Sequence, residues 1–262
     1  MQEIRLTIAL ELTDLDAKIL EYASFVCRSL PVSKIYFLHV AEDIELPESF
    51  LKDHPELANQ PKDESLEVNM RENVAKYFVS DREIAMDYEA LQGQVLEVLV
   101  QQSKLKMSDL LIVGKRNQVG SREVLSAKLA RRSLCSVLFV PETYDLDIKN
   151  ILVPVDFSEH SALAAQMALG LSNAVDGDII HFLNLYSVPS GYYRLGETYE
   201  ECSAKMESYA EEDYQQFLSK LENVDTNETQ AHFVDQKDHN KVALISGLLR
   251  QLDCQMLVMG SK

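Results

Sequence analysis

Short apolar runs alternate along the chain with longer stretches in which apolar residues recur every three or four positions. The runs are typical of buried strands, and the spaced pattern is typical of amphipathic helices. In the N-terminal half, strands are predicted at residues 6–10, 34–40, 84–88, 110–114 and 136–140. Helices are predicted between them, at residues 13–30, 64–79, 95–105 and 124–134. Such alternation indicates right-handed crossovers and a parallel sheet that is covered on both faces.

The C-terminal half repeats this order. Strands are predicted at residues 151–155, 178–185, 230–234 and 256–260, and helices at residues 158–172, 199–221 and 242–252. The first of these helices is expected to bury one face, which consists of Ala164, Met167, Ala168 and Leu171. The segment 187–196 is predicted to be a loop, because it combines Gly, Pro and Ser with few apolar residues.

Three segments recur at nearly one spacing. Residues 8–14 resemble residues 153–159, and residues 38–40 resemble residues 183–185, in both cases 145 positions later. Residues 110–114 resemble residues 256–260, 146 positions later. We interpret the chain as a tandem duplication of one α/β domain, with copies at 1–145 and 146–262.

The two predicted copies differ in length. The first continues after its fourth strand through a loop, a helix and a fifth strand, whereas the second stops at Lys262. By this analogy the second copy lacks roughly its last 27 residues. We therefore expect the sequence to be a truncated form, since a missing fifth strand would expose a sheet edge and an apolar face.

Composition and charge narrow the range of functions. A hydrophobic content of 46% with 26% charged residues is typical of a soluble globular protein, and no apolar run approaches the ~20 residues of a membrane span. The N-terminus does not resemble a signal peptide, so we expect a cytoplasmic protein. The net charge of −17 makes nucleic acid and anionic membranes poor partners.

Neither the cysteines nor the histidines suggest a metal centre. The four cysteines are far apart in the sequence and are expected to be reduced thiols of the core. Asp238 and His239 are the only adjoining candidate ligands, and neighbouring residues point in different directions. A surface turn is the favoured interpretation there, and we expect no metal site.

The sequence resembles the universal stress protein family in its tandem bacterial form. The segment Val-Pro-Val-Asp-Phe-Ser-Glu at 153–159 resembles the family's first strand, and residues 38–40 its second. Residues 90–93 resemble the turn before its third helix, and residues 134–141 its closing strand. The resemblance implies two doubly wound domains, each with a five-stranded parallel sheet of order 3-2-1-4-5, the second lacking its last helix and strand. It also implies that the domains pair through their fifth strands.

Some members of this family bind ATP, through a G-x2-G-x9-G-[S/T] loop after the fourth strand. Glycines allow the backbone to approach phosphate oxygens, and the final Gly-Ser opens a helix whose N–H groups face the anion. The adenine would lie where strands 1 and 4 diverge, which is the expected binding crevice of an open α/β sheet. A carboxylate at this place can accept hydrogen bonds from the sugar or the base.

In the second copy, several residues match positions that contact nucleotide in the ATP-binding members. These candidate cofactor-binding residues are Pro154, Val155, Asp156, Leu185, Met259, Gly260 and Ser261. The resemblance implies ATP there in the full-length protein, with Mg²⁺ accompanying it, and weak binding to the sequence as given. An alternative interpretation of Asp156 is a solvated turn or cap residue just before Ser158.

In the first copy, the same site is degenerate. Glu11 stands where the family has aspartate, and Asn117 where it has the second glycine of the loop. The other matching positions are Val40, Val113, Gly114, Gly120 and Ser121. Gly120 and Ser121 are a displaced Gly-Ser pair or, as we favour, a helix cap. Lys115 and Arg116 could still hold a phosphate, but no cofactor is expected in this copy.

The first functional hypothesis is a stress-response protein whose conformation or pairing is regulated by ATP in the second copy. The alternative is a scaffold of the same family that binds other proteins without nucleotide. We expect no catalytic residues, and at most slow ATP hydrolysis, because no nucleotide-transfer motif is present. The expected assembly is an intramolecular pair of the two domains, with a homodimer as an open alternative. Tyr192, Tyr193 and Arg194 could lie over the crevice, although a loop packed by its own aromatic residues is favoured.

Overall fold

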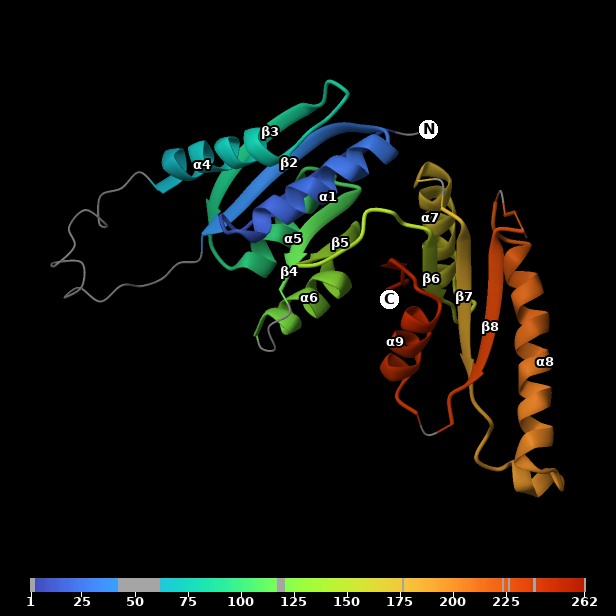
Figure 1. The fold of residues 1–262 in the computed structure, drawn as a ribbon. Helices are drawn as coiled ribbons and strands as arrows, with labels where there is room; N and C mark the ends of the chain where they lie inside the picture. The colour runs from blue at the N-terminus through green and yellow to red at the C-terminus, as the bar shows by residue number, and fades with distance from the viewer. Residues whose placement is uncertain are drawn as a thin grey trace, which may run out of the picture. The chain divides into compact units, whose positions relative to one another are not determined.

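A computed structural model describes residues 3–41, 62–116, 121–175, 177–222, 224–225, 227–237 and 239–261. The chain divides into two compact units, Met1–Tyr144 and Asp145–Lys262. Each unit has its own sheet and its own hydrophobic core, and each is considered by itself (Figure 1).

The first unit contains a five-stranded sheet in the order β3-β2-β1-β4-β5, and every neighbouring pair is parallel. This confirms the predicted fold class and strand order. The strands are β1 (Ile4–Leu10), β2 (Val32–Ala41), β3 (Ala85–Gln92), β4 (Leu110–Lys115) and β5 (Ser136–Pro141). The helices are α1 (Leu15–Ser29), α4 (Lys62–Tyr77), α5 (Val95–Leu105) and α6 (Ser121–Arg132).

Helices cover both faces of this sheet. The pair α1 and α4 packs on one face, and the pair α5 and α6 packs on the other. Phe37 on β2 is fully buried on the first face, where Phe78 meets its ring edge-on and Tyr88 stacks on it. On the second face, Leu38, Leu99 and Leu111 belong to one core cluster. Apolar runs in the strands thus serve two cores at once, as expected for a parallel sheet.

The second unit repeats this arrangement over the described residues. Its sheet has the order β8-β7-β6-β9, again parallel throughout, which corresponds to strands 3-2-1-4 of the first unit. The strands are β6 (Asn150–Pro154), β7 (Ile179–Tyr186), β8 (Thr229–Asp235) and β9 (Met256–Leu257). The helices are α7 (Glu159–Val175), α8 (Tyr199–Leu218) and α9 (Lys241–Gln251).

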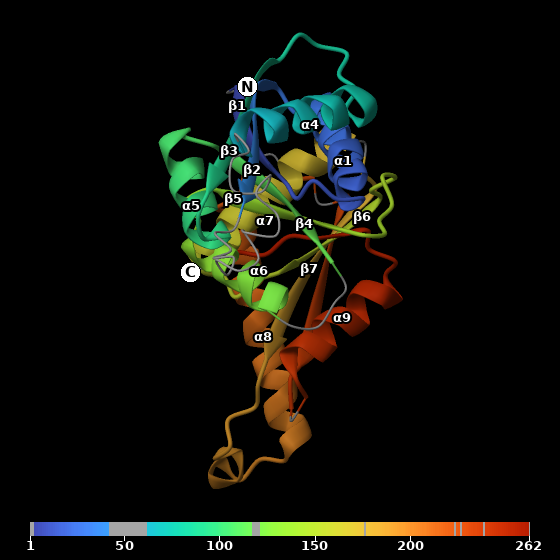
Figure 2. The ribbon, with the colours of Figure 1, turned by 90° about the vertical axis from the view of Figure 1, so that its left-hand side faces the viewer.

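Helices of the second unit lie on both sides of its sheet. α7 and α8 pack on one face, while α9 packs on the other through Ile245, Leu248 and Leu249 (Figure 2). Phe182 on β7 is buried beneath α8, with its ring against those of Tyr214 and Phe217. This unit is therefore held together by a core separate from that of the first.

Three details of the second unit differ from the sequence-based predictions. β9 contains two residues rather than the five predicted at 256–260, because only β6 pairs with it among the described strands. Met167 was expected to be buried, but its side chain lies on the outer side of α7 and is 49% exposed. The predicted loop at 187–196 contains a short 3-10 helix, Tyr192–Leu195.

Two histidines form a hydrogen bond across neighbouring strands of the second unit. Nδ1 of His181 on β7 lies 3.1 Å from Nε2 of His232 on β8, and His181 is only 4% exposed. Burial lowers the pKa of both imidazoles, and the charge of His232 lowers that of His181 further. The bond requires one nitrogen to donate and the other to accept, so it is lost when both rings are protonated.

We expect the second unit to lose stability as the pH falls below about 6.5, the ordinary pKa of histidine. In that range the unfolded chain binds more protons than the folded unit, so the free energy of unfolding should decrease between pH 7.5 and 5.5. Urea unfolding, followed by pulsed maleimide labelling of the buried Cys202, measures it. The His181→Gln/His232→Gln variant should show a flatter dependence, and an unchanged dependence would contradict this assignment.

Candidate functional site

The candidate site lies at the carboxyl edge of each sheet, where the first and fourth strands are neighbours. These are β1 and β4 in the first unit, and β6 and β9 in the second. The chain leaves β1 towards α1 on one face, whereas β4 is entered from α5 on the other. The strand order reverses here, and ligands of open α/β sheets bind at such a switch point.

In the second unit, backbone hydrogen bonds fix the end of β6. Pro154 ends the strand, and the Val155 amide donates to the Leu183 carbonyl at 2.8 Å. The buried side-chain amide of Asn184 donates to the Val155 carbonyl at 2.9 Å. Leu185, one residue further along β7, packs against the core on the α9 face. Pro154, Val155 and Leu185 are thus brought together.

Asp156 lies immediately beyond this strand and is exposed. Its Oδ1 accepts a hydrogen bond from the Ser158 amide at 3.1 Å, and the Ser158 hydroxyl in turn accepts from the Ser161 amide. Hydrogen bonding from Ser158 holds the pKa of the Asp156 carboxyl below its usual range. Asp156 therefore stabilises the turn into α7, in line with the turn interpretation, and at the same time presents an ionised carboxylate to solvent.

Three residues after the neighbouring strand β9, Gly260 passes very close to the start of α7. A Cβ built on Gly260 would lie 2.5 Å from the His160 carbonyl oxygen and 3.0 Å from the Ser161 amide nitrogen. Met259 beside it is 56% exposed. Ser261 follows as the last described residue of this edge. The glycine is thus required by helix packing, whether or not a ligand approaches it.

In the first unit, a buried aspartate holds the turn after β1. The two carboxylate oxygens of Asp16 accept hydrogen bonds from the amides of Glu11 and Leu12, each at 2.9 Å. Asp16 is only 1% exposed, and Leu12 has a φ of 57°. Burial raises the pKa of Asp16, and the two amide hydrogen bonds oppose this shift. The carboxylate compensates for a left-handed backbone that leucine does not favour.

The guanidinium of Arg116 lies at the end of β1. Its Nη2 donates to Thr13 Oγ1 at 2.7 Å and to Asp14 Oδ1 at 3.3 Å, and its Nε donates to Glu11 Oε2 at 3.4 Å. The side chain of Arg116 is 18% exposed and that of Glu11 is 30% exposed. Arg116, which the sequence suggested as a phosphate ligand, thus pairs with Glu11. Glu11 occupies the position in the first unit that Asp156 occupies in the second.

The remaining predicted residues of the first unit have structural roles or lie outside the described residues. Gly114 faces α1, where a Cβ would lie 2.6 Å from Leu15 Cδ2 and 2.8 Å from Ile19 Cδ1. Val40 and Val113 pack in the core on the α5 face, and Ser121 begins α6. Asn117 and Gly120 lie outside the described residues, as does Asp238.

Two residues that hold the backbone at the candidate sites were not predicted, Asp16 and Asn184. A charged residue beside Leu15 on the inner side of a predicted helix is a signal that could have identified Asp16. Asn184 stands within an apolar run, where a buried amide needs a partner. The aromatic loop packs on itself, since Tyr192 contacts Tyr193 and Tyr199 edge-on, which supports the favoured interpretation of that loop.

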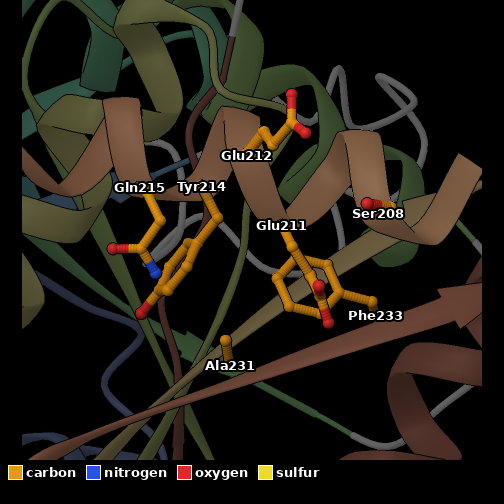
Figure 3. Close-up of a pocket in the computed structure, with 7 residues that line it drawn as sticks. All are labelled: Ser208, Glu211, Glu212, Tyr214, Gln215, Ala231 and Phe233. Carbon is orange, nitrogen blue, oxygen red and sulfur yellow. The ribbon is translucent and has the colours of Figure 1, made fainter.

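A separate pocket of about 360 Å³ lies between α8 and β8, away from the switch point (Figure 3). None of the predicted site residues lines it. Its walls are formed by Ser208, Glu211, Glu212, Tyr214, Gln215, Ala231 and Phe233.

Two searches of the structure gave negative results. Over the ranges that the structure describes, no cluster of three or more histidine, cysteine or acidic side chains has the geometry to hold a metal ion. No described helix combines the length and apolar character needed to span a bilayer.

Comparison with known proteins gives a family match for the second unit. The model of the universal stress protein family matches residues 147–262. A universal stress protein from Archaeoglobus fulgidus DSM 4304 is similar in structure, with a TM-score of 0.64 and 15% identity, over 99% of this chain and 87% of that one. A candidate universal stress protein from Pseudomonas aeruginosa UCBPP-PA14 gives 0.62 and 15%, over 98% and 82%. No match was found among curated proteins.

At these identities the structural similarity establishes the fold, and the family match covers the second unit. The first unit has the same strand order and the same crossover arrangement. The second unit therefore belongs to the universal stress protein family, and the first unit has the same fold.

Proposed function

We propose that this protein is a regulatory universal stress protein whose ligand, ATP or a related nucleotide, binds at the β6–β9 edge of the second unit. The resemblance of the sequence to ATP-binding members supports the proposal. We place the protein in the cytoplasm, with reduced thiols. We also propose that its two units pair within one molecule.

The observation that carries the proposal is the difference between the two acidic residues that follow the first strands. Glu11 is part of an ion pair with Arg116, which draws the guanidinium over the end of β1. Asp156 is exposed, and among the described residues no cationic side chain lies within ion-pair distance of it. The charge that would receive a ligand is thus neutralised in one unit and accessible in the other.

The residues at this edge suit part of a nucleotide. The ionised carboxylate of Asp156 can accept hydrogen bonds from the hydroxyls of a ribose or the amino group of a base. The exposed side chain of Met259, which follows β9, would supply an apolar contact to the ligand. Mg²⁺ would accompany the phosphates of bound ATP and reduce their repulsion from a protein with a net charge of −17.

Binding at this place would act through the turn into α7. The Asp156 carboxylate already accepts from the Ser158 amide, and Gly260 contacts the first turn of the same helix. A ligand that prefers one arrangement of this turn shifts the population of the molecule towards it. The role is regulatory, and no catalytic residue is assigned.

The alternative function is that of a scaffold which binds other proteins without nucleotide. For the first unit this alternative is favoured, because the Arg116 side chain satisfies the acidic residues at the switch point from within the chain. The ion pair of Glu11 with Arg116 and the exposure of Asp156 are both consistent with a protein in which only the second unit responds to nucleotide.

Thermal unfolding of the chain in the presence and absence of Mg²⁺ and ATP tests the proposal. ATP is expected to raise the unfolding temperature, and Asp156→Ala should abolish this rise. Glu11→Ala is the matched control, since it removes a carboxylate from the equivalent position of the first unit and should leave the rise unchanged. Adenosine, which lacks phosphates, tests the sugar and base contacts separately.

Two outcomes would contradict the proposal. If ATP and adenosine give no shift, and mass spectrometry finds no nucleotide released from the purified full-length protein, the scaffold function stands instead. If Asp156→Ala and Glu11→Ala reduce the shift equally, the ligand is not confined to the second unit.

A further inference from the structure

The pocket between α8 and β8 can be compared with the same place in the first unit. Val153 on β6 pairs with Phe182, as Ile8 on β1 pairs with Phe37, so the two buried phenylalanines occupy equivalent positions. The residue paired with Phe37 on the next strand is Tyr88. The residue paired with Phe182 is Ala231, which lines the pocket. An aromatic ring of the first unit is therefore replaced by a methyl group in the second.

A second replacement lies on the helix above. In the first unit, Met70 and Val74 are the buried residues of α4, and Arg71 follows the first of them. The Arg71 guanidinium lies over the ring of Tyr88, 4.1 Å from its centroid, which is a cation–π contact. The first unit thus fills this position with a planar cation stacked on an aromatic ring.

In the second unit, the equivalent residue of the helix carries the opposite charge. Of the four buried residues of α8, which are Cys202, Ala210, Tyr214 and Phe217, the pair Ala210 and Tyr214 has the same spacing as Met70 and Val74 on α4. We align these two pairs, and Glu211 follows Ala210 as Arg71 follows Met70. Glu211 and Glu212 both line the pocket, and Glu211 lies in front of Phe233, whereas the carboxylate of Glu212 points away from Ala231 (Figure 3). At the position on α8 that corresponds to Arg71, the helix therefore carries the carboxylate of Glu211, which can accept hydrogen bonds.

Aromatic surfaces remain available in the pocket. The rings of Tyr214 and Phe233 lie edge to face at a centroid distance of 5.8 Å, and both line the pocket. A guanidinium suits such walls, because it stacks on aromatic faces and donates to carboxylates in one plane. A protein with a net charge of −17 also attracts a cation at long range.

Strand β8, which forms one wall of the pocket, indicates how a partner polypeptide presents a guanidinium to it. Among the described strands β8 pairs only with β7, so no described strand pairs with the other edge of β8, whose residues Ala231 and Phe233 line the pocket. An extended polypeptide can add to such an edge and place alternate side chains in adjacent pockets. We propose that this pocket binds the guanidinium of an arginine side chain carried by a partner polypeptide that lies along the open edge of β8.

The test uses the whole chain and two peptides that differ only in charge. Acetyl-Thr-Val-Arg-Val-Thr-amide is titrated into the protein by calorimetry, beside the same peptide with neutral citrulline in place of arginine. The arginine peptide should bind about tenfold more tightly, because citrulline keeps the shape and loses the charge. Acetyl-arginine-amide, which cannot pair with a strand, should bind more weakly than the arginine peptide.

Variants locate the site. Ala231→Tyr restores the ring of the first unit and should abolish binding, while Glu211→Gln should weaken binding by roughly three- to tenfold. Asp213→Asn is the matched control, since it makes the same charge change on α8 at a residue that does not line the pocket. Glu211→Gln is a surface change, so the test does not depend on the folding of Ala231→Tyr.

The outcomes are distinct from those for the nucleotide site, which lies at another edge of the sheet. Equal binding of the arginine and citrulline peptides would overturn the proposal, as would equal effects of Glu211→Gln and Asp213→Asn. If acetyl-arginine-amide bound as tightly as the peptide, delivery along β8 would be wrong. Binding that requires arginine, the peptide chain and Glu211 together would establish it.

Discussion

Replacing Phe182 with alanine is expected to destabilise the second unit by roughly 3–5 kcal/mol, since the cost includes both lost burial and a residual cavity. The ring is 1% exposed and contacts the rings of Tyr214 and Phe217, so its removal leaves space that these neighbours cannot fill. Urea unfolding with pulsed maleimide labelling measures the effect, because Cys202 is buried in this unit.

The first unit contains the matched control for this substitution. Phe37→Ala removes the equivalent ring, and the buried Cys27 reports on unfolding there. Each variant should shift the labelling midpoint of its own unit and leave the other nearly unchanged, because each unit has its own core. Equal shifts at both cysteines in either variant would show that the two units unfold together.

Removal of the Asp16 carboxylate is the second substitution for which we expect a large effect. Asp16→Ala leaves the Glu11 and Leu12 amides without their acceptor, and hydrogen bonds to a charged group contribute about 1.5–3 kcal/mol each. We expect a net loss of about 2–3 kcal/mol, because alanine also relieves the cost of burying a charge. Labelling of Cys27 during urea unfolding measures it.

Two controls separate this effect from a general sensitivity of the turn. Asp16→Asn keeps one acceptor oxygen and should cost less than Asp16→Ala. Asp156→Ala removes the exposed carboxylate after β6 and should cost less than about 1 kcal/mol, because solvent can replace its hydrogen bond. A loss of similar size for Asp16→Ala and Asp156→Ala would contradict the distinction drawn between them.

Hydrophobic periodicity predicted a helix or strand well where the residues of that segment alone determine its secondary structure. The helix predicted at 95–105 is α5, and the sheet order follows from the alternation of strands and helices. Met167 shows where this reasoning fails. Its position corresponds to that of Tyr22 in the first unit. Tyr22 is buried because the ring of Tyr144 packs against it, with the two ring centroids 5.1 Å apart. Periodicity identifies a face of a helix, but burial depends on what packs against that face.

The candidate site was less predictable because it depends on contacts between distant residues. The sequence places Asp156 and Gly260 at strand ends, but it does not show that Arg116 reaches Glu11 across more than a hundred residues. The pocket residues Glu211 and Ala231 were missed for a related reason. Their counterparts in the first unit lie at slightly different offsets, so only the register of the strands and the burial of the helices reveal the two replacements.

The close approach of Gly114 and Gly260 to the neighbouring helices has a consequence for motif scans of this family. A side chain at Gly260 would collide with the backbone of α7, and one at Gly114 would require the side chains of Leu15 and Ile19 on α1 to move. Helix packing alone is therefore a sufficient reason for glycine at these positions, with or without a ligand. A pattern that scores it as a sign of nucleotide binding will return false positives, and the residue that faces the acidic side chain after the first strand should discriminate better.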